Sequence, residues 1–178
     1  MRIFLILVFI ASIVHADREG GPYLGIGYGV SEYNDGGLYA SLKDNEVQQR
    51  YTYGGAYINK NFSVELGYVN MLGDGIKIDD TTNVIYSLYS VSTLAHYAFF
   101  DDILDFYAKF GTGYVQGYKD ENGFSFVYGV GTSLRLTELL SIKVGYDKYE
   151  FGYDEDEDNS ADYTMYLEYS YVAVEFQF

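Results

Sequence analysis

The chain of 178 residues is long enough for one domain, and its formal net charge of −15 argues against binding to the phosphate backbone of nucleic acids. It contains no cysteine, so an exported form would have no disulfides to hold it together. Its 22 tyrosines exceed what one core requires, and tyrosine suits a membrane interface, where one end of the side chain is apolar and the other wet.

The first residues have the parts of a secretory signal peptide. Arg2 supplies the basic start, residues 3–14 are apolar or small, and Val14 and Ala16 suit the −3 and −1 positions of a cleavage site. The alternative, a membrane anchor, needs about 20 apolar residues, and this run is shorter. We therefore predict a signal peptide over residues 1–16, cleaved after Ala16, and a mature domain over residues 17–178. Loss of Arg2 makes the mature chain one unit more negative.

Eight segments downstream alternate between large apolar residues and small or polar ones, which is the period of a β-strand. In the first, YLGIGYGV at residues 23–30, glycine at every second position would destabilise a helix. The other segments lie at about residues 48–58, 62–69, 85–99, 106–114, 126–136, 141–149 and 171–178. No segment has the period of a helix.

The number, length and spacing of these segments predict a membrane barrel. Eight is the smallest even number of strands that closes as a bacterial outer-membrane barrel, in which long external loops alternate with short periplasmic turns. Here the connections after the first, third and seventh segments are long and polar, and that after the fifth is short for an external loop. We predict an all-β fold, an eight-stranded antiparallel transmembrane up-and-down β-barrel.

The composition of the two strand faces separates a membrane barrel from a soluble β-protein. One face is large and apolar, with tyrosine near its ends, as lipid would select. The other is mainly glycine, serine, alanine and threonine with isolated charges, whereas a solvated face would carry many long charged groups. We therefore assign the glycine-rich face to a narrow interior. In the segment at residues 48–58 this rule puts Tyr51, Tyr53 and Tyr57 toward lipid and Arg50 inside.

Several phrases resemble the outer-membrane β-barrel family that includes the OmpA transmembrane domain, OmpX and the opacity-type, porin-like proteins. They are GGPYLGIGYGVSEY, NFSVELGYV, FYAKFGTGYV, YGVGTSLRLTELLSIKVGYD and the terminal VAVEFQF. The resemblance implies a location in the outer membrane of a Gram-negative cell. In that family the last strand carries a signal for the barrel-assembly machinery, and Val174, Phe176 and Phe178 match it. Members often continue into a peptidoglycan-binding domain, which we do not expect here.

Six charged residues are candidates for ion pairs inside the barrel: Arg50, Glu65, Lys109, Arg135, Lys143 and Glu175. An unpaired charge inside a narrow barrel would cost several kcal/mol, so acids and bases should pair. We expect a salt-bridge network that plugs the lumen, because an eight-stranded barrel is usually filled by side chains. The alternative is a gated ion path.

Other possible sites give weaker signals. His96 could act as a base, but Ser92 is about 13 Å away along a strand and no acid is placed as in a triad, so we expect a packed histidine and no catalytic residues. In the acidic run DEDEDNSAD, Asp154, Asp156 and Asp158 copy the opening of an EF-hand loop, yet the glycine and the twelfth-position glutamate are missing. We expect a hydrated loop, with loose divalent-cation capture as the alternative. No cofactor is predicted.

These observations favour a small outer-membrane barrel with a structural or surface-interaction role, through membrane integrity, adhesion or recognition by acidic external loops. A small ion or solute channel is the alternative, and a lipid-modifying enzyme is a weaker one. The expected partners are outer-membrane lipid and lipopolysaccharide, the barrel-assembly machinery during biogenesis, and an extracellular partner at the loops. We expect a monomer.

Overall fold

The computed structural model describes residues 20–37, 45–77, 83–100, 103–117, 122–153 and 163–178. The predicted signal peptide and the acidic run at residues 154–162 lie outside these residues. None of the described residues belongs to a helix long and apolar enough to cross a membrane.

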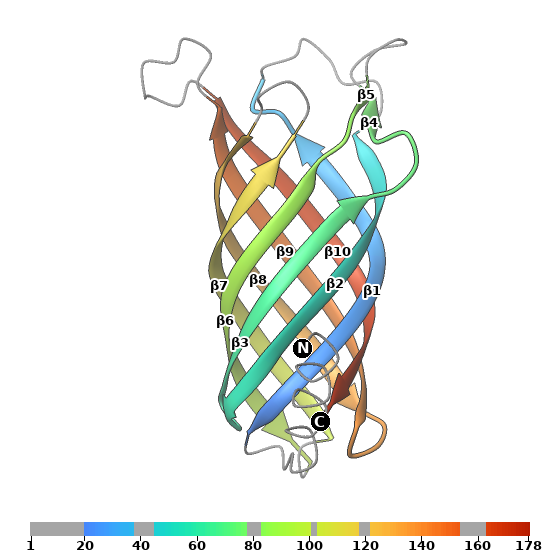
Figure 1. Ribbon diagram of the computed structural model, residues 1–178, viewed down its shortest axis with the longest axis vertical. Helices are drawn as coiled ribbons and strands as arrows, with labels where there is room; N and C mark the ends of the chain where they lie inside the picture. The colour runs from blue at the N-terminus through green and yellow to red at the C-terminus, as the bar shows by residue number, and fades with distance from the viewer. Residues whose placement is uncertain (1–19, 38–44, 78–82, 101–102, 118–121, 154–162) are drawn as a thin grey trace, which may run out of the picture.

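Eight long strands in the described part of the chain close into an antiparallel barrel (Figure 1), which confirms the predicted fold. They are β1 (Gly21–Asn34), β2 (Glu46–Asn59), β3 (Phe62–Met71), β6 (Ser87–Phe99), β7 (Leu104–Gln116), β8 (Asn122–Arg135), β9 (Leu140–Tyr153) and β10 (Tyr163–Gln177). Their order around the barrel is β1-β10-β9-β8-β7-β6-β3-β2. The last strand pairs with the first, and Val174 lies opposite Ile26. No sheet edge is therefore left open among these strands.

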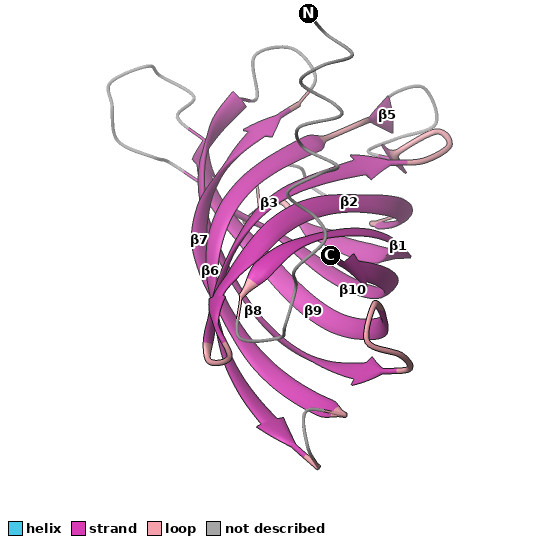
Figure 2. Cartoon of the chain, turned by 60° about the horizontal axis from the view of Figure 1, so that its bottom comes forward, coloured by secondary structure: helices cyan, strands magenta, loops and turns pink. Residues whose placement is uncertain are grey.

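The two ends of the barrel differ. At one end β1 begins and β10 finishes, and the strands are joined there by residues 60–61, 100–103 and 136–139. We call this the terminus end; it comes forward in Figure 2, where the tilt of the strands is also visible. At the other end, the loop end, the connections are residues 35–45, 72–86, 117–121 and 154–162. The predicted alternation of connections therefore matches the two ends.

The outer wall is apolar because strand alternation carries the large apolar residues outward. Leu66 is 60% exposed and Phe110 is 65% exposed, although both lie in the middle of strands. Val64, Val144 and Val174 also lie on the exposed face, as predicted. A belt of this kind would be unfavourable in water and is favourable against hydrocarbon.

The predicted orientation of β2 is wrong. Tyr51, Tyr53 and Tyr57 are buried inside the barrel, whereas Arg50 is exposed on the outer wall. The rule that the glycine-rich face is the inner face cannot be applied to this strand. Gly54 and Gly55 are adjacent, so one lies on the inner face and the other on the outer face. The space for the tyrosine rings of β2 is left by glycines on the neighbouring strands. A Cβ atom on Gly25 of β1 would lie 2.1 Å from the ring of Tyr53.

Tyrosine therefore has a second role beyond the membrane interface, since much of it fills the lumen. The buried tyrosines are Tyr23, Tyr33, Tyr51, Tyr53, Tyr57, Tyr86, Tyr107, Tyr149, Tyr169 and Tyr171. Many of their rings contact one another; Tyr51 and Tyr53, for example, stack with centroids 4.7 Å apart. The interior is narrow, as expected, but it is packed with aromatic rings and not merely lined by small residues.

The interior has two layers along the barrel axis. Toward the loop end it is filled mainly by apolar side chains, which include Val47, Val69, Met71, Leu88, Val115, Val127, Phe151, Met165 and Leu167. A short hairpin of β4 (Ile76–Lys77) and β5 (Asn83–Val84) adds Ile76 and Val84, both at most 2% exposed, to this apolar layer. This hairpin was not predicted, because the connection that contains it has the composition of a long polar loop. Toward the terminus end, the interior is polar and charged.

Candidate functional site

The charged interior is organised around one lysine and one glutamate that meet across the lumen. Lys109 of β7 lies 2.9 Å from the Glu65 carboxylate of β3 and 2.6 Å from Asp147 of β9. The other Glu65 oxygen lies 2.8 Å from the ammonium group of Lys143, also on β9. All four side chains are at most 3% exposed. Because the pairs join strands that are not neighbours, they cross the lumen and fill it.

Tyrosine hydroxyl groups complete this network. Tyr51 donates a hydrogen bond of 2.5 Å to Glu65 and accepts one of 3.1 Å from Lys109. Glu175 accepts a hydrogen bond of 3.2 Å from Tyr57 and lies 3.8 Å from the Lys143 ammonium group. Rings also flank the cation of Lys143, with the centroid of Tyr53 at 4.5 Å. Glu65, Lys109 and Lys143 each have several such partners, which makes their burial tolerable, whereas the ion pair of Asp147 is with Lys109 alone.

Four of the six predicted interior charges therefore come together: Glu65, Lys109, Lys143 and Glu175. Arg135 lies at the terminus end of β8, partly buried, and donates a hydrogen bond of 3.1 Å to the Gln177 side chain, apart from the central network. Arg50 is on the opposite face of the wall, so the prediction that it lies inside is wrong. Asp147 was missed as an ion-pair partner, although it shares the alternation of Lys143 and could have been found from that spacing.

A second polar cluster lies nearer the terminus end. The Nδ1 atom of His96 is 2.7 Å from Asp105, and its Nε2 atom is 2.8 Å from the Ser63 hydroxyl group. The expectation that no acid is placed beside His96 is therefore wrong. The partners come from β3 and β7, on either side of β6, and Ser92 is not one of them. The pairing of strands, which the sequence does not show, creates this arrangement.

The distances within this cluster are those of a Ser-His-Asp triad, but its surroundings differ from those of an active site. Ser63 and Asp105 have no exposed surface, and the Ser63 hydroxyl group is also 3.3 Å from that of Tyr23. The ring of Tyr57 lies 5.1 Å from the imidazole ring and helps to enclose it. Through its contacts to Asp105 at Nδ1 and to Ser63 at Nε2, the imidazole ring ties three strands together. The described geometry gives a substrate no path to the serine.

The remaining predicted sites fall at the chain end and in a loop. Val174 and Phe176 lie on the outer wall, 38% and 48% exposed, and the Phe178 amide donates a hydrogen bond of 2.9 Å to the Pro22 carbonyl. Asp154, Asp156 and Asp158 lie outside the described residues. Among the residues that are described, no three acidic or histidine side chains are grouped closely enough to hold a metal ion.

The apolar outer wall, the closed strand order and the filled interior define a small transmembrane β-barrel of the outer-membrane type. The chain belongs to the outer membrane protein β-barrel domain family, whose sequence profile matches residues 3–171. The protein is thus a component of the bacterial outer membrane. No curated protein matches the sequence.

Solved structures of outer-membrane barrels share the fold at low sequence identity. The attachment invasion locus protein Ail of Yersinia pestis is 15% identical, with a TM-score of 0.60 over 90% of this chain and 99% of that one. Neisserial surface protein A is 15% identical, with a TM-score of 0.59 over 89% and 97% of the two chains. The N-terminal barrel of Pseudomonas aeruginosa OprF is 14% identical, with a TM-score of 0.56 over 89% and 99%. These likenesses show the fold alone.

Proposed function

We propose that the protein is a closed outer-membrane anchor with a structural and surface-interaction role. The observation that carries this proposal is the apolar layer inside the loop end of the barrel. Leu88 and Val115 are at most 1% exposed there, and Ile76 and Val84 of the short hairpin pack with them. An ion that crossed this layer would lose its hydration among mainly apolar side chains and would meet few polar groups, such as the Gln49 amide and the Tyr33 and Tyr86 hydroxyl groups.

The ion-pair network gives a second barrier below the apolar layer. Glu65, Lys109 and Asp147 occupy the lumen in direct contact, so they act as a plug. A gate built on these pairs alone would open only as far as the apolar layer, which stays closed above it. The geometry therefore supports an anchor over a channel.

Planar-bilayer recording tests the closed barrel directly. The purified, folded protein should give no steady conductance steps above those of protein-free membranes. Folding is checked on the same preparation by heat-modifiable migration on a gel. Reproducible single-channel steps from the folded form would overturn the proposal and favour the channel.

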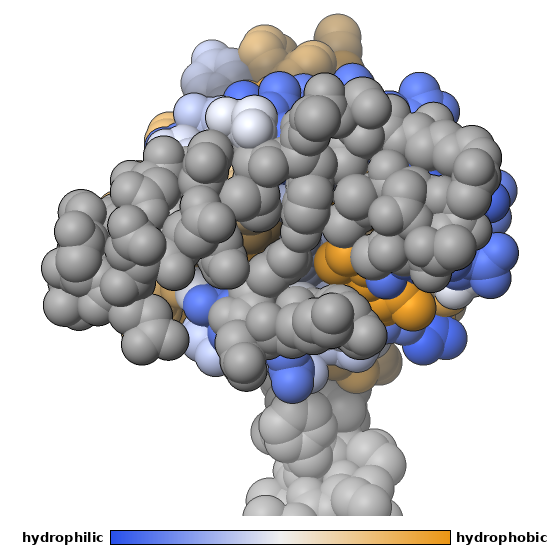
Figure 3. Space-filling view, turned by 90° about the horizontal axis from the view of Figure 1, so that it is seen from above, coloured by the Kyte–Doolittle hydropathy of each residue, from blue (hydrophilic) through white to orange (hydrophobic). Residues whose placement is uncertain are grey.

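The surface role rests on the acidic character of the loop end. Glu32, Glu46, Glu150 and Glu168 lie on outward-facing positions near that end, and the adjoining loops carry more acidic than basic residues. Viewed from above, hydrophilic residues are visible at several places along the edge of this end (Figure 3). With the long loops external, this surface would attract basic partners, or divalent cations that bridge to lipopolysaccharide.

Ail has been crystallised with the heparin analogue sucrose octasulfate, which offers a useful contrast. We expect this protein not to bind that polyanion, because its surface charge repels it, and to bind polylysine in a manner that salt weakens. Binding of both probes by surface plasmon resonance, with the folded protein in lipid nanodiscs, tests this. Salt-sensitive binding of sucrose octasulfate would contradict the acidic-surface role.

We also propose that the barrel is not an enzyme and that its last strand directs assembly. The buried Ser63–His96–Asp105 cluster is assigned a structural role because substrate has no path to it. Val174, Phe176 and Phe178 are assigned to recognition by the assembly machinery. Deletion of Phe178 should reduce the folded fraction in cells but leave refolding of the purified chain into detergent unchanged. Equal losses in both settings would point to stability and not to recognition.

A further inference from the structure

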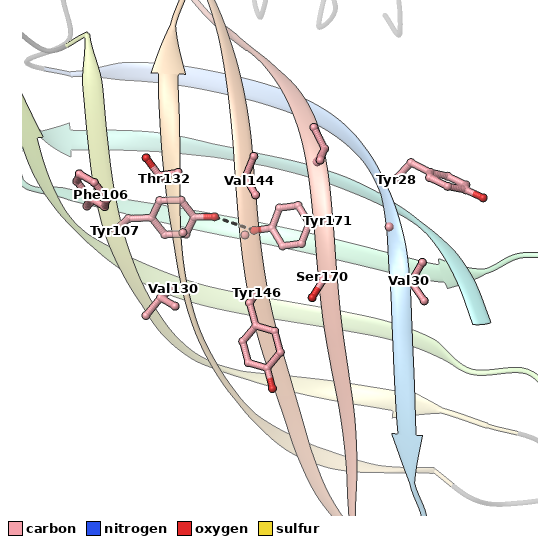
Figure 4. A pocket seen from close by; sticks show the side chains of 14 residues that line it. Tyr28, Val30, Phe106, Tyr107, Val130, Thr132, Val144, Tyr146, Ser170 and Tyr171 are labelled. Atoms are coloured by element: carbon pink, nitrogen blue, oxygen red, sulfur yellow. Dashed lines mark hydrogen bonds between the residues drawn. The ribbon is translucent and has the colours of Figure 1, made fainter. Parts of the chain in front are cut away.

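An apolar trough crosses the outer wall from β7 to β1 (Figure 4), with a volume of about 810 Å³. Its floor is backbone, because Gly131 lies opposite Gly145 in the register of β8 and β9. Behind this floor, Tyr107 and Tyr171 meet inside the barrel through a hydrogen bond of 3.0 Å between their hydroxyl groups. The trough is therefore a rigid feature of the wall, backed by packed rings.

Bulky side chains form the two sides of the trough, and small ones widen it. Phe106, Val144 and Tyr28 stand on one side, and Tyr146 and Val30 stand on the other. Ser170 occupies the second side between Tyr146 and Val30, opposite both in register, and it leaves the space open. An elongated apolar group would fit along this path, which crosses five strands or about 19 Å.

The trough slopes along the barrel and ends beside a cation. Phe106 lies near the terminus end of β7, whereas Tyr28 lies opposite Arg50 of β2, four residues from that strand's start at the loop end. Strands tilt in such barrels, so a row of paired residues also runs obliquely across the membrane. Arg50 thus continues the side formed by Phe106, Val144 and Tyr28 and stands at its upper end.

Charge at the upper end favours one kind of occupant. Arg50 is exposed, and none of the ion pairs seen among the described residues includes it. A second outer-wall cation near this end, Lys148, is held by Glu168 at 2.8 Å. A guanidinium group at the edge of an apolar belt is suited to a phosphate, which it can bind through two parallel hydrogen bonds.

We propose that this trough binds a phosphorylated glycolipid of the outer leaflet, with one acyl chain between Tyr28 and Phe106 and a phosphate on Arg50. The next outward row toward the loop end holds Val30 opposite Gln48, and the row after it holds Glu46 opposite Glu32, so the phosphate must lie on the membrane side of these carboxylates. The site depends on the outer-membrane location of the protein and is independent of whether the barrel conducts.

Native mass spectrometry of the detergent-solubilised protein with added bisphosphorylated lipid A tests the site. The wild type should retain one lipid A molecule. Arg50→Gln should reduce retention about tenfold, because it removes a charge-assisted contact. Ser170→Phe, which fills the trough, should reduce it similarly. Lys60→Gln, at an exposed turn of the terminus end, and Thr52→Phe, on the outer wall outside the trough, are the matched controls.

Three further outcomes decide the nature of the occupant. Removal of the phosphates from lipid A should abolish the difference between wild type and Arg50→Gln. Glu46→Gln should strengthen the retention of lipid A, because it removes a negative charge that repels the phosphate. Weaker retention by Glu46→Gln would indicate cation bridging through the carboxylates and would overturn the contact to Arg50. Equal retention of phosphatidylglycerol, or equal retention of lipid A by the two test variants and their controls, would overturn the site. Heat-modifiable migration verifies that each variant is folded.

Discussion

Replacement of Lys109 by methionine should destabilise the barrel strongly without opening it. The substitution keeps much of the side-chain volume but removes the ammonium group that contacts Glu65 at 2.9 Å and Asp147 at 2.6 Å. Asp147 then has no cation among the described contacts, and Glu65 keeps only Lys143. Removal of one partner from a buried ion pair costs about 3–5 kcal/mol, because it leaves an uncompensated charge.

Two further variants test whether the large loss of stability in Lys109→Met comes from the burial of its ion pairs. Lys148→Met breaks a pair of similar length, 2.8 Å to Glu168, but these side chains are 22% and 38% exposed. Its loss should cost less than about 1 kcal/mol. The double variant Lys109→Met/Asp147→Asn restores the charge balance around Glu65 and should recover more than half of the lost stability. Asp147→Asn alone should cost less than Lys109→Met, because Lys109 keeps Glu65.

The assay is urea unfolding of each variant in phospholipid vesicles, followed by circular dichroism and by migration on a gel without heating. Bilayer conductance is measured on the same samples and should stay at the wild-type level, because the apolar layer around Leu88 remains. A Lys109→Met protein as stable as Lys148→Met would refute the account of a buried network. A clear rise in its conductance would refute the closed barrel and favour the gated path.

Three other substitutions or probes test separate parts of the structure. Leu88→Ser weakens the apolar layer and should produce brief conductance steps that Leu66→Ser, on the outer wall, does not produce; equal traces would show that this layer is not the seal. An alkyl fluorophosphonate should fail to label Ser63 in the folded protein, and stoichiometric labelling would show that the cluster is accessible. Gly131→Ala should lower the free energy of unfolding by more than about 1 kcal/mol, because its Cβ would lie 2.4 Å from the Val144 carbonyl oxygen. The control is Gly123→Ala, whose Cβ would lie 3.4 Å from its nearest neighbour. Equal stabilities of the two variants would contradict the close packing around Gly131.

The parts of the fold that follow from local alternation could be predicted from the sequence. The outward positions of Val64, Leu66 and Val174 depend only on the period of a strand and on which face is large and apolar. The same rule failed for β2. Gly54 and Gly55 lie on opposite faces of the strand, and tyrosine is compatible with both the lipid-facing wall and the interior. The inner face of that strand is decided by glycines on β1 and β3, which a segment read alone does not show.

The candidate sites depend even more on register between strands. His96 meets Asp105 only because β6 and β7 pair so that His96 lies opposite Tyr107, which brings Asp105 to the same end. Ser63 meets the other side of the ring through the pairing of β3 with β6. Neither partner is near His96 at a spacing that would mark a motif, so a search along the sequence finds only Ser92.

The reciprocal arrangement of glycine and tyrosine explains why the interior can hold so many charges. A glycine on one strand admits a ring from the next, as Gly25 admits Tyr53, and each ring brings a hydroxyl group or a π-face to the lumen. Those groups contact Glu65, Glu175 and Lys143, so the same packing that fills the space also stabilises the buried ions. Nearer the loop end, valine, leucine and methionine side chains pack among the remaining rings, such as those of Tyr33 and Tyr86, and the ion-pair network ends. In the closed barrel that we propose, the apolar layer beyond this change is the main barrier to an ion, and the charges below it are a second one.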